Sequence, residues 1–540
     1  MYGNISITEL FSRLHFLENH TRCQSDELAK KQQKIDEQTE EIKVLKEELN
    51  RLTEFLKLAG KKIYGSSTER MSEDYGQLSF YEDDEEQIVS PAQTKVSTYT
   101  RKKRCTLEEK MKNIPKTVVF HKLTDEEKIC RECGEEMAVI GYDSFIQVEY
   151  IPSHLEVQEH RKEKAVCRKC SKKDENGIFA VAKAPSPLME RSYATPSLIS
   201  HIICEKYVKA VPLYRIEKEF VYSGISISRQ TMDNLMIAAS DMLMPLYELI
   251  HRILLTFDII HADETPMQVN LVKGRNKPVK GYMWVYRSGR YSEVPIILYE
   301  YRNGRKGEYP KTFLNGFMGY LHCDGLKQYD NVENITRAGC WAHLRRYFLN
   351  AVNVQSNKKD FSTTAGQGLM MINEIFRIEG RNPERPNEKS KYTLEEIAHI
   401  RNTKSKRLAE NFFEWCRKIQ GTGLPKNLTG KAIGYAIGQE KSLMNVFLDP
   451  RLELTNNAAE RAVKPVVIGR KNWLFSHCER GARANAVLYS IIETAKENML
   501  KPYEYIKWIL ESLKNMSFES FEDFLPWGDK IPDNLKIKSC

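Results

Sequence analysis

A run of strand-like segments in the middle of the chain constrains the fold more than any other feature. Short apolar or alternating stretches recur there between turn-forming residues, as expected of strands in a buried sheet. The pattern predicts, in order, strands at 253–261, 282–286 and 296–301, a helix around 310–315, strands at 320–323 and 338–341, and a helix through His343 and Phe348. Three strands followed by alternating helices and strands indicate a mixed α/β domain with helices covering one sheet.

Two acidic residues stand where predicted strands end. The order of elements is typical of an RNase H-like nucleotidyltransferase core, whose first and fourth strands lie side by side. Asp263 follows the first predicted strand and Asp324 follows the fourth, so their carboxylates are expected to be neighbours. A third carboxylate must come from a helix. Glu460 fits, because Asn456 or Asn457 can cap a helix that begins there.

Three carboxylates in one cleft predict a site for Mg²⁺ or Mn²⁺, because these ions take oxygen ligands and keep room for water and phosphate oxygens. Two such ions can activate the attacking oxygen and stabilise the leaving oxygen of a displacement at a phosphodiester. The chain has 73 acidic residues, so three acids alone are not specific. Glu264, Asp258 and Asp330 are rival candidates, and strand order ranks Asp263 and Asp324 above them.

Two CxxC pairs predict a metal site of another kind. Cys130 with Cys133 and Cys167 with Cys170 are spaced to grip one tetrahedral zinc ion. Alternating apolar and polar residues at 146–150 predict an antiparallel ribbon between the pairs. Because four cysteines close the coordination sphere, this zinc is expected to hold the fold rather than to do chemistry.

The composition and the absence of apolar runs indicate where the chain acts and what kind of molecule it binds. The N-terminal segment lacks the pattern of a secretory signal, and no apolar run reaches the roughly 18 residues that a membrane span needs. These observations predict a cytoplasmic chain with reduced thiols. Lys and Arg total 82 against 73 for Asp and Glu, which gives a net charge of +9 and mildly favours a polyanionic partner.

A heptad pattern near the N-terminus predicts a coiled coil. Apolar residues recur every seventh position, at Leu28, Ile35, Ile42, Leu49 and Leu56. The offset positions are apolar only in the second half of the segment. We therefore expect a homodimer or higher oligomer, and the alternative is one amphipathic helix packed on its own domain.

The region before the predicted sheet is helical. Candidate helices at 197–209 and 213–222 precede a turn at Gly224 and a further helix that opens with Arg229 and Gln230. This arrangement predicts a helix-turn-helix reader of the DNA major groove. A plain helical hairpin gives the same pattern, and exposure of Arg229 and Gln230 would distinguish the two.

Basic residues gather near the predicted acids and are expected to contact backbone phosphates of DNA. They are Arg345, Arg346, Arg461, Lys464, Arg470 and Lys471. Trp473 lies among them, and a core position is favoured over stacking on a base. Cys340 and His343 are spaced for one helix face, but a thiolate would recruit zinc rather than Mg²⁺, so Cys340 is expected to pack in the core.

Four segments carry a family resemblance: 261–265 (HADET), 323–325 (CDG), 340–346 (CWAHLRR) and 456–462 (NNAAERA). They resemble the insertion sequence 66 family of DDE transposases. Segment 64–70 is similar to that family's junction after a leucine-zipper-like helix, the CxxC pairs to its zinc-binding domain, and 469–475 to the stretch after its glutamate. Thr455 and Lys464 depart from the family's usual Asp and Arg, and neither removes a predicted metal ligand.

The resemblance implies a bacterial, nucleoid-associated transposase that binds the terminal repeats of its element and a double-stranded DNA target. It implies metal-dependent strand cleavage and strand transfer by Asp263, Asp324 and Glu460, possible only with a divalent ion bound. Accessory proteins of the same element are candidate partners. The alternative function is a catalytically silent, transposase-derived DNA-binding regulator, and a third reading is a metal nuclease that only hydrolyses, because strand transfer and hydrolysis share the same site.

The expected organisation is a multidomain α/β chain with an RNase H-like catalytic core. The expected parts are coiled-coil helices at 1–63, a polar linker at 64–115, a zinc-binding ribbon at 116–185, a helical DNA-binding region at 186–250, the first part of the core at 251–353, a helical insertion at 354–450, the second part of the core with its Glu at 451–498, and a C-terminal helical segment at 499–540.

Overall fold

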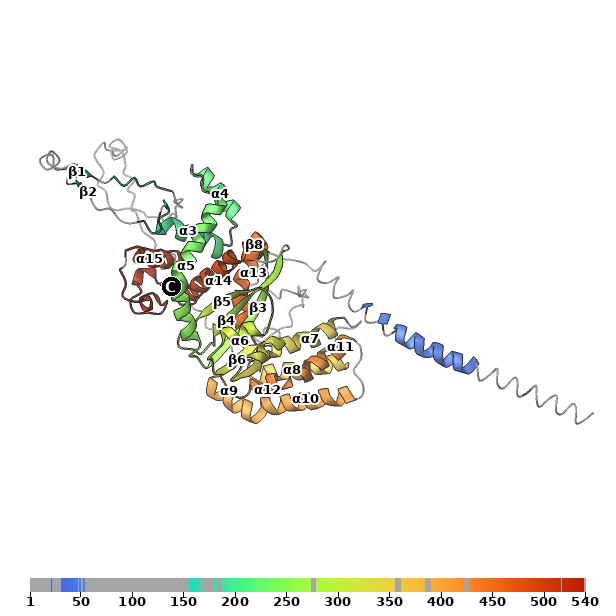
Figure 1. The fold of residues 1–540 in the computed structure, drawn as a ribbon. Helices are drawn as coiled ribbons and strands as arrows, with labels where there is room; N and C mark the ends of the chain where they lie inside the picture. The colour runs from blue at the N-terminus through green and yellow to red at the C-terminus, as the bar shows by residue number, and fades with distance from the viewer. Residues whose placement is uncertain are drawn as a thin grey trace, which may run out of the picture.

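A computed structural model of the chain is shown in Figure 1. It describes residues 21, 31–46, 48–49, 52–53, 155–161, 163–166, 179–181, 187–190, 192–272, 278–354, 361–383, 390–421, 427–515 and 517–538. The predicted zinc ligands Cys130, Cys133, Cys167 and Cys170 lie outside these residues, as do the alternating segment 146–150 and the linker at 64–115. Strands β1 (Lys164–Val166) and β2 (Phe179–Val181) pair antiparallel on either side of the second cysteine pair.

A mixed sheet forms the centre of the molecule. Its strands are β3 (Ile259–Leu271), β4 (Val279–Ser288), β5 (Ile297–Arg302), β6 (Gly319–Cys323), β7 (Ile335–Gly339) and β8 (Phe475–Cys478). Their order is β5-β4-β3-β6-β7, and β8 pairs with the far end of β3. The pairs β3–β4 and β4–β5 are antiparallel, whereas β6 runs parallel to β3 and β7 parallel to β6. The first and fourth strands of this domain are therefore neighbours.

Sequence reasoning placed the start of the first strand too early. Residues up to Leu254 belong to the long helix α5 (Arg229–Leu254), and β3 begins only at Ile259. The first two residues of the predicted strand end that helix, with Leu254 fully buried, and residues 255–258 turn the chain into β3. A short apolar run has no period that distinguishes a buried helix end from a strand. Asp263 consequently lies within β3 rather than after it, and the strand predicted at 338–341 ends at Gly339.

The helices divide between two hydrophobic cores. The first core joins the sheet to α3 (Pro196–Tyr207), α4 (Leu213–Tyr222), α5, α6 (Glu308–Phe313), α13 (Asn457–Trp473), α14 (Glu479–Glu497) and α15 (Pro502–Asn515). In α5, Leu243, Leu246 and Ile250 recur on one helix face and are fully buried. Burying each such side chain contributes about 2 kcal/mol.

The second core is built by the chain that separates β7 from α13. It contains residues of α7 (Trp341–Asn353), α8 (Thr364–Ile378), α10 (Lys406–Gly421), α11 (Leu428–Gly438) and α12 (Glu440–Asn445), and the short helix α9 (Leu394–Ile400) belongs to the same stretch of chain. Figure 1 shows these helices gathered below the sheet. Trp341 lies at their centre, fully buried among the rings of Phe412, Phe413 and Phe447.

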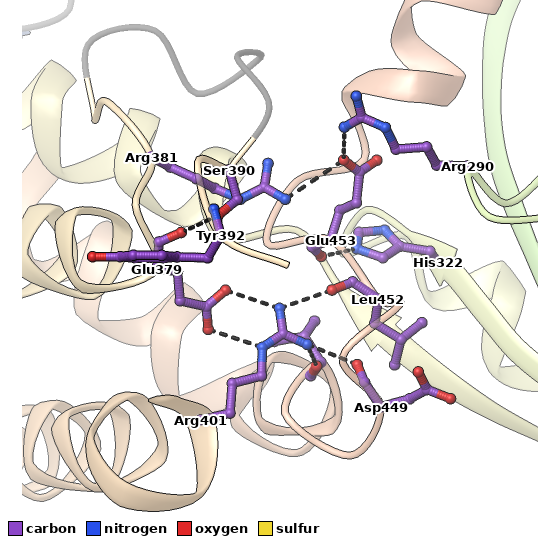
Figure 2. Close-up of polar contacts among 11 residues, drawn as sticks. Arg290, His322, Glu379, Arg381, Ser390, Tyr392, Arg401, Asp449, Leu452 and Glu453 are labelled. Carbon is purple, nitrogen blue, oxygen red and sulfur yellow. Dashed lines mark hydrogen bonds and ion pairs between the residues drawn. The ribbon is translucent and has the colours of Figure 1, made fainter. Parts of the chain in front are cut away.

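A buried arginine ties this helical insertion to the segment that returns to the sheet (Figure 2). Arg401 is 2% exposed, and its Nε and Nη2 each donate to a Glu379 carboxylate oxygen at 2.9 Å. Its remaining donors reach backbone carbonyls of the returning segment, at Val446 and Asp449 (2.7 Å each) and at Leu452 (2.8 Å). The guanidinium therefore satisfies three carbonyls that no regular element serves.

The helical stretch near the N-terminus is exposed wherever it is described. Residues 31–46, 48–49 and 52–53 are helical, and the described apolar members of the heptad pattern, such as Ile35 and Leu49, are at least half exposed. Pairing of this helix with a second copy stays a prediction. Among the described helices, none combines the length and apolar character that a membrane span requires.

We expect Arg401→Ala to lower the free energy of unfolding by about 3–5 kcal/mol, because it removes the partner of the buried Glu379 charge and a donor to three carbonyls. Urea denaturation followed by tryptophan fluorescence measures this loss. Arg417→Ala is the matched control, because it removes a half-exposed arginine whose ion pair with Glu440 lies at the surface; we expect a loss below about 1 kcal/mol. Equal losses for the two variants would contradict the role of Arg401.

Candidate active site

Two of the three predicted acids follow paired positions of neighbouring parallel strands. The register between β3 and β6 pairs His261 with His322. Asp263 lies two positions after His261 within β3, and Asp324 lies two positions after His322, directly after the end of β6. Each is oriented by a backbone amide: Asp263 Oδ1 accepts from Glu264 N at 2.8 Å, and Asp324 Oδ1 accepts from Leu326 N at 3.0 Å.

Glu460 reaches the same place from the first turn of α13, which packs on β3 and β4. Asn456 precedes this helix and bonds it to the sheet. Its Nδ2 donates to the carbonyl of Ala262 at 2.8 Å, and its Oδ1 accepts from His261 Nδ1 at 2.9 Å. The residue just before Asp263 is thus joined directly to the residue that starts the Glu460 helix.

The expected side-chain cap of α13 is absent. Asn456 occupies the N-cap position, but its side chain makes no capping hydrogen bond. The reason is that both polar atoms of the amide are engaged with β3. Neither the pairing of His261 with Asn456 nor the stacking of His261 on His322, with ring centroids 4.8 Å apart, was expected from the sequence. Both histidines and Asn456 are almost fully buried. His261 and Asn456 do stand in the motifs that carry the family resemblance, but contacts between distant segments have no local signal.

The three carboxylates repel one another. The pKa of Asp263 is raised well above its ordinary value, first by burial and then by the charges of Glu264, Asp324 and Glu460. A divalent cation would relieve this repulsion, and the donors present are the oxygens that Mg²⁺ and Mn²⁺ prefer. The donor types therefore suit such an ion, although among the described residues the three ligand atoms that already lie within 4.8 Å of one another belong to Cys340, His343 and Glu460.

The rival acids are occupied elsewhere. Glu264 accepts from Arg305 and from Tyr329 Oη, the latter at 2.9 Å, and burial together with Asp324 raises its pKa to about 7. Asp258 is two-thirds exposed and pairs with Arg451 at 2.8 Å. Asp330 is exposed and pairs with Arg337. Of the three rival acids, Glu264 is the one beside the site: it directly follows Asp263 in β3, and its charge helps to raise the pKa of Asp263.

Three side chains near the start of α7 lie close to Glu460: His343, Arg346 and the N-cap residue Cys340. His343 Nδ1 lies 3.5 Å from Glu460 Oε1, and Arg346 Nη2 lies 3.9 Å from Glu460 Oε2. Cys340 is 1% exposed, so the expectation that it packs in the core agrees with its burial, and burial raises its pKa to about 12. Its Sγ nevertheless faces the same point: Cys340, His343 and Glu460 offer ligand atoms within 4.8 Å of one another.

The predicted DNA-contacting residues lie on several surfaces. Arg229 and Gln230 open α5 and are both exposed, the feature that favours a groove reader, although Arg229 also pairs with Glu217 at 3.1 Å. Arg345 bonds Asn373 through Nε at 2.7 Å. Arg346 lies in α7 beside Glu460, and the remaining four residues belong to α13 itself. Arg461 lines a cavity of about 290 Å³ with Arg287 and Arg290, Lys464 is half-buried one turn after Glu460, and Arg470 and Lys471 line a groove of about 510 Å³ beside β3. Trp473 packs against the first core, as favoured.

Comparisons with known proteins agree with this architecture. Residues 191–484 match the Transposase IS66 family, residues 490–527 match the IS66 C-terminal element, and residues 127–171 match the zinc-finger binding domain of transposase IS66. These matches define the class of the molecule as a transposase. The chain belongs to the IS66 transposase family.

Similar proteins occur in Sinorhizobium fredii (strain NBRC 101917 / NGR234). The chain is 28% identical to the uncharacterized protein y4hP over 419 residues, which cover 74% of this chain and 73% of that protein. It is 27% identical to the uncharacterized protein y4qI over 507 residues, which cover 91% of this chain and 90% of that protein.

We expect Asp263→Asn to be more stable than the wild type in EDTA at neutral pH, because it removes one of the repelling charges. Because folding raises the pKa of Asp263, this carboxyl group makes its full contribution to folded-state stability below the ordinary carboxyl pKa. That contribution is lost as pH rises towards the folded-state pKa. The advantage of the variant should therefore grow from acid to neutral pH, as thermal unfolding measures.

Added Mg²⁺ should reverse the ranking, because an ion that binds only the folded wild type raises its melting temperature. Asp258→Asn, at an exposed acid outside the site, should respond to Mg²⁺ as the wild type does. If Mg²⁺ raises the melting temperature of Asp263→Asn as much as that of the wild type, the carboxylates do not form the site.

Proposed function

We propose that this chain is the transposase of a bacterial insertion sequence, which binds the terminal repeats of its element and cuts and joins DNA strands with Mg²⁺ or Mn²⁺. One observation carries the proposal. Asp263 and Asp324 each lie two positions after the paired residues His261 and His322 of the parallel strands β3 and β6, and the charge of Glu460 acts on Asp263 from the first turn of α13. Such a set in a member of a transposase family suits phosphodiester chemistry.

We assign the sheet to the RNase H-like class. The assignment is supported by the order β5-β4-β3-β6-β7, in which the first three strands of the domain are antiparallel and the next two are parallel. It is also supported by the positions of Asp263 within the first of these strands and of Asp324 directly after the fourth. The helices α8 to α12 then form an insertion before the helix that carries Glu460.

In this proposal Asp263, Asp324 and Glu460 hold the divalent ions. When bound, the ions activate the attacking oxygen and stabilise the leaving oxygen of the displacement. The protein's own residues set the geometry. Asn456 holds the start of α13 against β3, and Arg346 pairs with Glu460, its Nη2 3.9 Å from Oε2.

The proposed DNA contacts follow from exposure and charge. Arg229 and Gln230 would read a major groove, and phosphates would be bound by Arg345, Arg346, Arg461, Lys464, Arg470 and Lys471. We propose that the enzyme acts as a homodimer or higher oligomer on nucleoid DNA in the bacterial cytoplasm, with accessory proteins of the same element as candidate partners.

We expect Asp263→Ala to bind DNA carrying the element's terminal repeats as the wild type does, and to lose cleavage by about a thousandfold or more, because an ion ligand is lost while the DNA-binding surfaces remain. Incubation with labelled repeat DNA and Mg²⁺ measures both properties. Asp258→Asn is the control and should cut normally. Undiminished cutting by Asp263→Ala would refute the site, and DNA binding without cutting by the wild type would indicate a silent regulator.

We also propose that Cys130, Cys133, Cys167 and Cys170 hold one structural zinc ion, supported by the zinc-finger match at 127–171. The freshly purified protein is expected to contain about one zinc per chain by metal analysis. The double variant Cys130→Ser with Cys133→Ser should contain none, because only two thiolates remain to bind it. A folded wild-type protein without zinc would contradict this assignment.

A further inference from the structure

The first turns of two helices, α7 and α13, bring three potential metal ligands of different chemical types close together. Cys340 is the N-cap residue of α7 and His343 lies in its first turn, so the three-residue spacing places both on one helix face. Glu460 comes from the first turn of α13. The sulfur, ring nitrogen and carboxylate oxygen of these residues lie within 4.8 Å of one another. They are a thiol, an imidazole and a carboxylate, each from a different class of donor.

Two of these ligand atoms have unsatisfied hydrogen-bonding capacity. His343 Nδ1 and Glu460 Oε1 are both buried, and neither has a hydrogen-bond partner among the described residues. Such buried atoms are uncommon in native proteins, and an ion or an ordered water is a usual explanation. The ion pair with Arg346 engages the other oxygen of Glu460, whereas Oε1 faces His343 Nδ1 at 3.5 Å, beyond a good hydrogen bond.

The third ligand is also prepared for a metal. Cys340 Sγ accepts the backbone N–H of Asn456 at 3.2 Å. An N–H donor directed at sulfur stabilises negative charge on it. A sulfur, a nitrogen and an oxygen donor together select Zn²⁺ over Mg²⁺, and three protein ligands leave a fourth tetrahedral position for water.

We propose that Cys340, His343 and Glu460 form a second metal site, which takes Zn²⁺ and competes with the catalytic ions for the carboxylate of Glu460. The competition rests on the proposed function, whereas zinc binding does not. On binding, Zn–S, Zn–N and Zn–O bonds form, the thiol S–H bond breaks, and its proton leaves to solvent. Because Glu460 cannot serve both sites fully, zinc inhibits strand cleavage.

Zinc stoichiometry tests the site without reference to activity. Full-length protein is incubated with a small excess of Zn²⁺, freed of loose metal by gel filtration, and analysed for zinc. We expect the wild type to carry about one zinc more per chain than Cys340→Ser, because a serine hydroxyl still accepts the Asn456 N–H but binds zinc poorly. Cys416→Ser, at a buried cysteine of α10, is the matched control and should bind as the wild type does.

A second variant guards against misfolding. His343→Gln removes a ring whose Nδ1 has no hydrogen-bond partner in the described structure, so it should fold, and it should also lose the additional zinc. With Co²⁺ in place of Zn²⁺, the wild type should show more thiolate-to-metal absorption than Cys340→Ser. Equal zinc content in the wild type and in the folded variants would overturn the site.

The competition is tested by the ratio of cleavage rates with and without zinc, at constant Mg²⁺. At zinc about ten times above its dissociation constant we expect the wild-type rate to fall about tenfold, because roughly one site in ten stays free. The ratio for Cys340→Ser should stay near one. Zinc bound without inhibition would overturn the competition alone. A wild type that never cleaves would refute the proposed function, while the stoichiometry would still decide the zinc site.

Discussion

The architecture depends on the hydrogen bonds that Asn456 makes to β3. Its amide joins His261 and Ala262 to the start of α13, across 195 positions of sequence. Among the described residues, the other polar bonds between the helix that carries Glu460 and the strand that carries Asp263 come from Arg470, near the far end of the helix, to Thr265 and Pro266. Mutually repelling carboxylates do not converge by themselves, so neighbouring buried bonds must hold them together. Each such bond contributes only about 1 kcal/mol net, yet leaving a buried partner unsatisfied costs about 1–3 kcal/mol, which makes the arrangement specific.

The helical insertion is compatible with this contact because buried bonds fix the segment that leads from the insertion back to the sheet. Arg401 and Glu379 form a fully buried ion pair, and the same guanidinium binds the carbonyls of the returning segment (Figure 2). Glu453 follows immediately, paired with Arg290 at 3.1 Å, while its carbonyl accepts from His322 Nε2 at 2.7 Å. A buried ion pair adds little net stability over apolar packing. Here its effect is to determine where the chain re-enters the sheet.

Local patterns predicted much of the fold, and contacts between distant segments account for what they missed. The bounds of α4 at 213–222 and the strands later seen as β4, β5 and β6 follow from apolar spacing and alternation. The neighbouring positions of Asp263 and Asp324 follow from the rules for parallel strands. The apolar end of α5 was mistaken for a strand because its burial depends on the rest of the fold. Asn456 was likewise predicted to cap a helix because its bonds to β3 depend on the tertiary structure. The tertiary structure also brings Cys340 and His343 close to Glu460, which no local pattern indicates.

The central claim is that Asp263, Asp324 and Glu460 form one divalent-metal site. A crystal structure of the full-length protein grown with Mn²⁺, with anomalous diffraction recorded at the manganese edge, tests this claim most directly. The account predicts anomalous density between the carboxylates of Asp263 and Asp324, with an oxygen of Glu460 completing the site. Manganese density at other acids, or a Glu460 side chain turned away from an occupied Asp263–Asp324 pair, would contradict it.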